Sequence, residues 1–140
     1  MTVKINSYVS FGGNARQAAE FYKSIFGGEV FMDTMGKYAD SMPVDDADKD
    51  KIMHFFLKGE HGIEVMGADT PKGLEYDEGS RITLALNGDD EEMLRGYWGK
   101  LVEGGSVIMP LEKAPWGDSF GMLTDKFGVK WMIDIGPVQK

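Results

Sequence analysis

The sequence predicts an α+β protein in which one βαβββ pattern occurs twice. Three observations lead to this fold. Two stretches, residues 14–30 and 90–107, place apolar residues at i, i+3, i+4 and i+7, which gives each a helix with one buried face. Both helices end at a pair of glycines, and both lie between one strand-like segment and three more. Because a repeat fixes the architecture, we expect two similar modules.

The two helices match position by position. A small polar residue suited to an N-cap opens each one, Asn14 in the first and Asp90 in the second. Glycine pairs that can adopt a left-handed C-cap conformation end them, at residues 27–28 and 104–105. The expected buried faces consist of Ala18, Phe21, Tyr22 and Ile25 in the first helix and Leu94, Tyr97, Trp98 and Leu101 in the second.

The strands are predicted from β-branched and aromatic residues that alternate with polar ones. They are residues 3–11, 29–35, 52–58 and 63–68 in the first half, and 81–87, 106–111, 119–124 and 130–135 in the second. We expect a single domain of residues 1–140, with module one at about 1–70, a linker at about 70–80 and module two at about 81–137.

A four-stranded sheet of this kind, mixed but mainly antiparallel, has one face for its helix and one face left over. Two curved sheets with helices on their outer faces would enclose a cleft lined by alternate strand residues, which is the geometry of a small-molecule pocket. The acidic, irregular residues 36–51 are predicted to form either a lid over such a pocket or a solvated loop.

Composition excludes several classes of protein. A chain of 140 residues with 42% apolar residues can bury a core, and the absence of cysteine excludes disulfides and thiolate chemistry. The net charge of -8 argues against a nucleic-acid partner, because such binding depends on Lys and Arg neutralising phosphates. No apolar run is long enough to span a membrane, and residues 1–11 do not resemble a signal peptide. We therefore expect a cytoplasmic protein that does not bind membranes.

The two predicted βαβββ modules resemble the vicinal oxygen chelate superfamily. This superfamily includes glyoxalase I, extradiol dioxygenases and the fosfomycin- and bleomycin-resistance proteins. More narrowly, the chain resembles the PhnB-like branch. Residues 8–30, 53–57, 84–93 and 116–135 carry the resemblance, and together they span nearly the whole chain. The last segment is the most specific, because its WGD, FG, LTD, FG and W elements are not explained by strand propensity alone.

Catalytic members of this superfamily hold a divalent metal with His and Glu residues on the strand faces that line the cleft. We locate the family's histidine positions in this chain by counting back from the polar residue that opens each helix. The count gives Ser7 in the first half and Ile82 or Thr83 in the second. The final glutamate position falls on Met132. Since none of these side chains replaces the usual ligands, the resemblance implies a protein without the usual metal site, and we expect no cofactor.

His54 is the best single candidate for a functional residue. It lies within the predicted strand 52–58, whereas the chain's other histidine, His61, lies in the hairpin turn. Together with Glu64 on the paired strand, His54 could bind a metal or carry out acid–base chemistry near neutral pH. Alternatively, His54 is a hydrogen-bonded residue at the edge of the pocket and Glu64 faces outward. The sequence leaves both interpretations open.

The resemblance and the alternation of strand residues together suggest which side chains line the pocket. If Met132 occupies a ligand position, then Met122 and Ser7 face the cleft as well, and Trp131 points the other way, into the helix layer. Methionine and aromatic side chains there would suit a flat or apolar ligand. The expected pocket-lining residues are Ser7, His54, Phe56, Met66, Trp116, Phe120, Met122 and Met132.

Three functions fit these observations. The first is a PhnB-like protein that binds a small molecule without a metal, as a homodimer with C2 symmetry. The second is a metal-dependent lyase or dioxygenase that uses His54 and Glu64. The third is a resistance protein that sequesters an antibiotic. Whether the protein is an enzyme is left open by the sequence.

Overall fold

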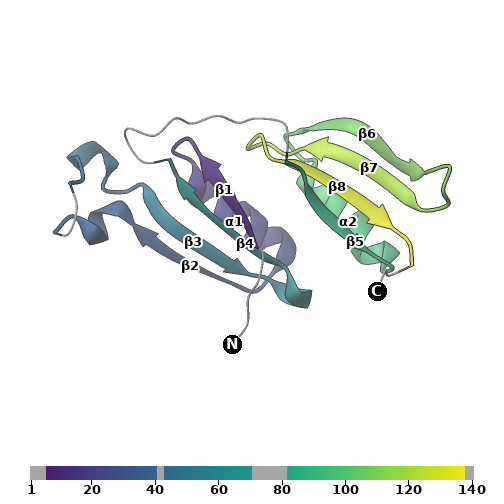
Figure 1. The fold of residues 1–140 in the computed structure, drawn as a ribbon, viewed down its shortest axis with the longest axis horizontal. Helices are drawn as coiled ribbons and strands as arrows, with labels where there is room; N and C mark the ends of the chain where they lie inside the picture. Colours follow the sequence, from purple (N-terminus) through teal and green to yellow (C-terminus); the bar gives the residue numbers. More distant parts are fainter. Residues whose placement is uncertain (1–5, 41–42, 71–81, 138–140) are drawn as a thin grey trace. The chain divides into compact units, whose positions relative to one another are not determined.

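The computed structural model describes residues 6–40, 43–70 and 82–137 (Figure 1). The chain forms two compact units, Met1–Asp77 and Glu78–Lys140, which we call module one and module two. Each contains one four-stranded mixed sheet and one α-helix in the order βαβββ, so the predicted α+β class and repeat are confirmed. Apart from Thr70, the expected linker lies outside the described residues, and the expected cleft stays a prediction.

In module one the strands lie in the order β1, β4, β3, β2. The pairing of β1 with β4 is parallel, and the other two pairings are antiparallel. The central hairpin is formed as predicted, with its strands on either side of a short turn at residues 59–63. The elements are β1 (Ser7–Phe11), α1 (Ala15–Phe26), β2 (Glu29–Thr34), β3 (Ile52–Lys58) and β4 (Glu64–Asp69).

Module two repeats this topology, with the strand order β5, β8, β7, β6 and a parallel pairing of β5 with β8. Its last two strands have the predicted bounds. Strand β6 is longer than predicted and contains two irregularities in its pairing with β7. The elements are β5 (Leu84–Gly88), α2 (Glu91–Leu101), β6 (Ser106–Lys113), β7 (Ser119–Thr124) and β8 (Lys130–Ile135).

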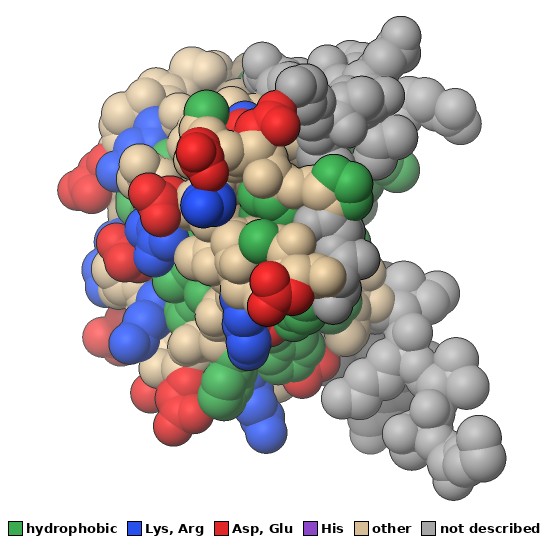
Figure 2. All heavy atoms as spheres, turned by 90° about the vertical axis from the view of Figure 1, so that its left-hand side faces the viewer, with side chains coloured by type: hydrophobic (Ala, Val, Ile, Leu, Met, Phe, Trp, Pro, Cys, Tyr) green, Lys and Arg blue, Asp and Glu red, His purple; other side chains and the backbone are tan. Residues whose placement is uncertain are grey.

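Two short 3-10 helices, Met35–Tyr38 and Asp46–Asp48, lie in the described parts of the acidic segment, residues 36–40 and 43–51. Two of its lysines neutralise neighbouring carboxylates, since Lys49 and Lys51 each form an ion pair of 2.9 Å with an Asp three residues earlier. On the face shown in Figure 2, acidic and basic side chains are interspersed, so the acidic composition produces no single-sign patch there.

Helix α1 packs on β2, β3 and β4 and forms the core of module one with them. Its small residues let the helix approach the sheet closely, and its larger residues fill the space against Phe55 and Leu57 of β3, both fully buried. The buried positions of the helix are Ala15, Ala18, Ala19, Tyr22, Ile25 and Phe26.

The N-terminus of α1 is capped by Asp69, at the end of β4, and not by Asn14. Asn14 occupies the N-cap position but makes no side-chain cap hydrogen bond. Instead, Asp69 Oδ1 accepts hydrogen bonds from the backbone N–H groups of Gly13 (3.0 Å) and Ala15 (2.9 Å), and Asp69 Oδ2 accepts one from Ile52 (2.9 Å). A side chain that is only 2% exposed therefore joins the helix to β4 and to the start of β3.

A second buried aspartate, Asp125, organises the hairpin between β7 and β8 in module two. Its Oδ1 accepts hydrogen bonds from the backbone N–H groups of Phe127 (2.8 Å) and Val129 (3.0 Å). Its Oδ2 accepts one from Trp131 Nε1 (2.9 Å). The predicted turn at residues 125–128 is formed, with a Gly128 N–H to Asp125 C=O hydrogen bond of 3.0 Å.

The N-cap of α2 is formed as expected, in contrast to that of α1. The side chain of Asp90 accepts a hydrogen bond from the backbone N–H of Met93, whereas Asn14 makes no such bond.

We predict that Asp69→Ala lowers the free energy of unfolding of module one by about 3 kcal/mol, because three N–H groups lose a buried charged acceptor. Asn14→Ala is the matched control at the helix N-terminus and should change it by less than about 0.5 kcal/mol. Urea denaturation followed by circular dichroism measures both variants. Equal effects of the two substitutions would contradict the assignment of the cap to Asp69.

Candidate functional site

Each sheet has one face against its helix, and we call the opposite face its open face. Side chains of directly paired strand residues share a face, so the register identifies which residues lie together. On the open face of module one, large side chains cross all four strands. Tyr8 and Phe31, at the two edges, are 54% and 56% exposed. This aromatic row consists of Tyr8, Met66, Phe56 and Phe31.

His54 lies on the same open face, two residues before Phe56 on β3, and is half-buried. Its ring stacks on that of Tyr8, with the ring centres 5.9 Å apart and the planes inclined by 22°. On its other side, Asp33 of β2 is its direct partner in the register. The imidazole therefore lies between a phenol ring and a carboxylate, at one end of an apolar surface.

Asp33 is held in place by two donors from the segment that follows β2. Lys37 Nζ lies 2.9 Å from Asp33 Oδ1, and the Tyr38 hydroxyl donates to Asp33 Oδ2 at 3.2 Å. The hydrogen bond from Lys37, followed by that from Tyr38, lowers the pKa of Asp33 below its usual value. Asp33 therefore presents a negative charge beside His54.

Glu64 shares the open face with His54 but does not lie beside it. Its direct partner on β3 is Lys58, and His54 lies four residues farther along that strand. Four residues of extended chain span about 13 Å, and side chains stand roughly perpendicular to the sheet. The register therefore keeps these two side chains too far apart to share one metal ion.

The open face of module two carries thioether side chains where module one carries aromatic rings. Met132, Met122 and Met109 are direct partners across β8, β7 and β6, next to Ala85 of β5. We call these three methionines the methionine row. Met122 and Met132 are half-buried, and Met109 is 47% exposed. A surface of this kind is apolar and adapts its shape readily.

Phe120 also lies on the open face of module two, in the register row next to the methionine row. Its ring makes an edge-on contact with that of Trp116, with the centres 5.5 Å apart. Trp116 precedes β7 and is 62% exposed. The structure therefore brings together Trp116, Phe120, Met122 and Met132 as the sequence suggested, although it does not test whether they bind a ligand.

Ser7 lies on the helix-side face of module one and not on the open face that we expected. Its partners in the register are Val65 and, through β4, Leu57, and both of these side chains are buried against the helix layer. Its neighbour Tyr8 takes the position on the open face. A shift of one residue exchanges the two faces of a strand, so counting back from Asn14 placed the wrong residue of β1. Trp131, by contrast, is buried on the helix side as predicted.

A pair of carboxyl groups lies at the end of the open face of module two. Asp134 is the register partner of Phe120, and its Oδ1 atom is buried without a hydrogen-bond partner among the described residues. Burial first, and then the hydrogen bond and the charge of Asp118, raise the pKa of Asp134 above its usual value. Burial and the neighbouring carboxyl of Asp118 therefore both disfavour the ionised form of Asp134.

We predict that Asp134→Asn raises the melting temperature at about pH 7 and that this gain shrinks toward about pH 4. A carboxyl whose pKa is raised on folding stabilises the fold fully below its unfolded-state pKa, and this contribution is lost as the pH rises through the folded-state pKa. Asparagine keeps the shape without ionising. Differential scanning calorimetry across this range measures the effect, with the exposed Asp89→Asn as control. A lower melting temperature of Asp134→Asn at neutral pH would contradict the prediction.

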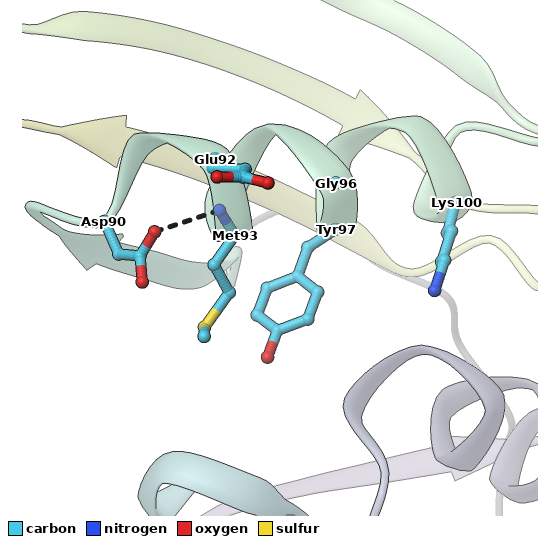
Figure 3. Close-up of a pocket in the computed structure, with 6 residues that line it drawn as sticks. All are labelled: Asp90, Glu92, Met93, Gly96, Tyr97 and Lys100. Carbon is cyan, nitrogen blue, oxygen red and sulfur yellow. Dashed lines mark hydrogen bonds between the residues drawn. The ribbon is translucent and has the colours of Figure 1, made fainter.

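Helix α2 also carries a hollow on its exposed flank, of about 400 Å³ (Figure 3). Met93, Tyr97 and Lys100 project to the same side there, and Gly96 leaves room because it has no side chain. Asp90 and Glu92 complete the lining, at the start of the helix. Among the described residues, those that line the hollow belong to α2 and its cap.

Only some of the residues on these open faces were predicted from the sequence. His54, Phe56 and Met66 were expected on the open face and lie there, whereas Tyr8, Phe31 and Asp33 were missed. Strand alternation places Phe31 and Asp33 on the same face of β2, but it does not decide which face is covered by the helix. No sequence signal pairs Asp118 with Asp134, which come from different strand ends.

The arrangement of two βαβββ modules agrees with the comparison of the sequence with protein families. Residues 4–133 match the glyoxalase/bleomycin resistance protein/dioxygenase superfamily. The chain belongs to this superfamily. The resemblance found in the sequence is thus confirmed.

Relatives within the superfamily include proteins of the PhnB type. The chain is 35% identical to protein PA1353 from Pseudomonas aeruginosa, with a TM-score of 0.82 and coverage of 98% of this chain and 100% of that one. It is 26% identical to the PhnB protein from Bacillus cereus, with a TM-score of 0.70 and coverage of 96% and 100%. Protein YjdN from Escherichia coli (strain K12) is 26% identical over an alignment of 138 residues, which covers 94% of this chain and 94% of that protein.

The donor set of this superfamily member does not fit the metal site of its catalytic relatives. Met132 lies on the open face, where its thioether is a poor ligand for a hard divalent ion, and the open-face position of β1 is held by Tyr8, which is neither His nor Glu. Within residues 6–40, 43–70 and 82–137, no three His, Cys, Asp or Glu side chains lie close enough together to hold a metal ion. No helix in these ranges is long and apolar enough to cross a membrane.

Proposed function

We propose that this protein binds a small, flat or apolar molecule on the open faces of its sheets, without using a metal ion. The aromatic row carries the proposal. It crosses all four strands of module one and leaves Tyr8 and Phe31 more than half exposed. Contiguous apolar surface of this kind generally marks a binding site. Aromatic rings and thioethers together make favourable contacts with flat ligands.

His54 gives the proposed site a polar end. Its imidazole can donate or accept a hydrogen bond, and its contact with Tyr8 orients the ring beside the aromatic row. Asp33, opposite in the register, adds a negative charge beside it. The ligand that fits these features has an apolar body and one polar group, which would lie toward His54.

The metal-dependent alternative requires His54 and Glu64 to act together, and the register gives it no support within module one. An antibiotic-sequestering protein would use the same open faces, because sequestration needs binding and no catalytic residue. We also propose that the protein is a C2 homodimer, for which light scattering coupled to size-exclusion chromatography is the test. Its cytoplasmic location stays a prediction.

We predict that planar aromatic compounds raise the melting temperature more than aliphatic compounds of the same size, because ligands of the folded state stabilise it. Phe31→Ser and Tyr8→Ser should each weaken the binding of the best aromatic compound about two- to tenfold, through loss of a ring contact. Thermal-shift screening followed by calorimetric titration measures both effects.

Both substitutions are at exposed positions, so the variants should fold. Ile82→Ser is the matched control, because Ile82 is 78% exposed and precedes β5, outside the aromatic row. Binding that survives Phe31→Ser and Tyr8→Ser unchanged would rule out the open face of module one as the site.

We predict that protein purified without chelator contains no stoichiometric divalent metal, because the open faces lack the usual ligand set. Elemental analysis by mass spectrometry measures this content. His54→Ala provides the comparison. A full equivalent of metal in the unaltered protein that is lost in His54→Ala would refute metal-independent binding and support the lyase or dioxygenase alternative.

A further inference from the structure

The two helices cover their sheets differently. Helix α1 packs on three strands of module one, including the central strands β3 and β4. Helix α2 makes its main contacts with β5 and β8, which lie at one edge of the sheet in module two. As a result, part of the helix side of β6, at the other edge, stays exposed. Val107, which pairs with the buried Leu123 and so faces the helix side, is 48% exposed.

A groove of about 500 Å³ lies beside α2 on this exposed side. Its size falls within the range of about 300–1,000 Å³ that is typical of small-molecule sites. Trp98 and Leu111 belong to the hydrophobic cluster of module two, and Val107 and Pro110 complete the apolar lining. The groove lies on the face of the sheet opposite to the open face, so it does not depend on the proposed function.

Gly121 of β7 makes this groove possible. A Cβ atom at this position would lie 2.7 Å from Leu111 Cα and 2.9 Å from Trp98 Cη2. Both distances are shorter than real Cβ contacts allow, so only glycine lets the indole ring and β6 approach this point of the sheet together. The irregular pairing of β6 on both sides of Met109 further changes the direction of this strand.

Among the described residues that line the groove, Arg95 of α2 is the charged one. Its Nε forms an ion pair of 2.8 Å with Glu91, and its Nη2 lies 3.5 Å from Ser119 Oγ. Both members of the ion pair are exposed, and exposed pairs contribute little free energy, so an anion can compete with Glu91 for the guanidinium. Arginine presents a planar set of donors that matches a carboxylate.

We propose that this groove is a second binding site, for an aromatic carboxylate. The ring of the ligand would lie against Trp98 and Leu111, and its carboxylate would bind the guanidinium of Arg95. The chain carries a net charge of -8, which disfavours anions in general. We therefore expect the guanidinium of Arg95 to be the feature that makes the groove bind an acid more tightly than a neutral ligand of the same shape.

The test uses 2-naphthoate and its neutral analogue 2-(hydroxymethyl)naphthalene, titrated calorimetrically into the full chain. The unaltered protein should bind the acid more tightly. Arg95→Gln should weaken binding of the acid about tenfold or more and leave the alcohol unchanged, because it removes only the charged hydrogen bonds. Val107→Asp should weaken both compounds about tenfold or more by placing a carboxylate in the apolar lining.

Ile82→Asp is the control, because Ile82 is exposed, precedes β5 and belongs neither to the described lining of the groove nor to the aromatic or methionine row. The indole N–H signals of the unaltered protein give a readout that needs no variant: Trp98 should shift with 2-naphthoate and Trp116 should not. The proposal is overturned if 2-naphthoate does not bind, if Arg95→Gln leaves its affinity unchanged, or if Ile82→Asp weakens binding as much as Val107→Asp. A shift of Trp116 without one of Trp98 would also overturn it.

Discussion

Module one depends on the buried carboxylate of Asp69. Its three hydrogen bonds join the N-terminus of α1 to the end of β4 and the beginning of β3, three places that are far apart in the sequence. A buried carboxylate is costly to desolvate unless it is fully hydrogen-bonded, and here the backbone supplies the donors. Because this contact fixes the side of the sheet that α1 covers, it also fixes which side remains open.

Module two achieves a related result by different means. Asp125 also accepts three hydrogen bonds, but the donors are two backbone N–H groups of its own hairpin and the indole N–H of Trp131. The cap of α2 is supplied locally by Asp90. The helix is therefore not tied to the sheet by a buried carboxylate in the way that α1 is. It lies toward β5 and β8 and leaves an apolar groove along β6.

The open faces acquire their character from the register. In module one it aligns Tyr8, Met66, Phe56 and Phe31 across four strands, with His54 and Asp33 at one end. In module two it aligns Met132, Met122 and Met109 across three strands. Membership of the superfamily sets the fold, whereas these side chains decide what the surface can bind. The binding of an apolar molecule is the chemistry that they support.

How much the sequence predicted can be judged at particular residues. Helix periodicity, glycine pairs and turn chemistry are local, so they placed α1, α2 and the turn at Asp125 to within a few residues. Face assignment in β1 failed because it was counted from Asn14 across a turn, and one residue of difference exchanged Ser7 with Tyr8. The capping role of Asp69 could not be predicted, since its partners lie 17 to 56 residues away in the chain.

The sequence by itself determined the repeated βαβββ order, the superfamily and the absence of the usual ligand residues, because each of these depends on residue types and short spacings. Only the tertiary structure decided which residues share a face, that His54 contacts Tyr8 and not Glu64, and that α2 leaves part of β6 exposed. Those outcomes depend on strand register and on how each helix packs, which are set by contacts between distant segments.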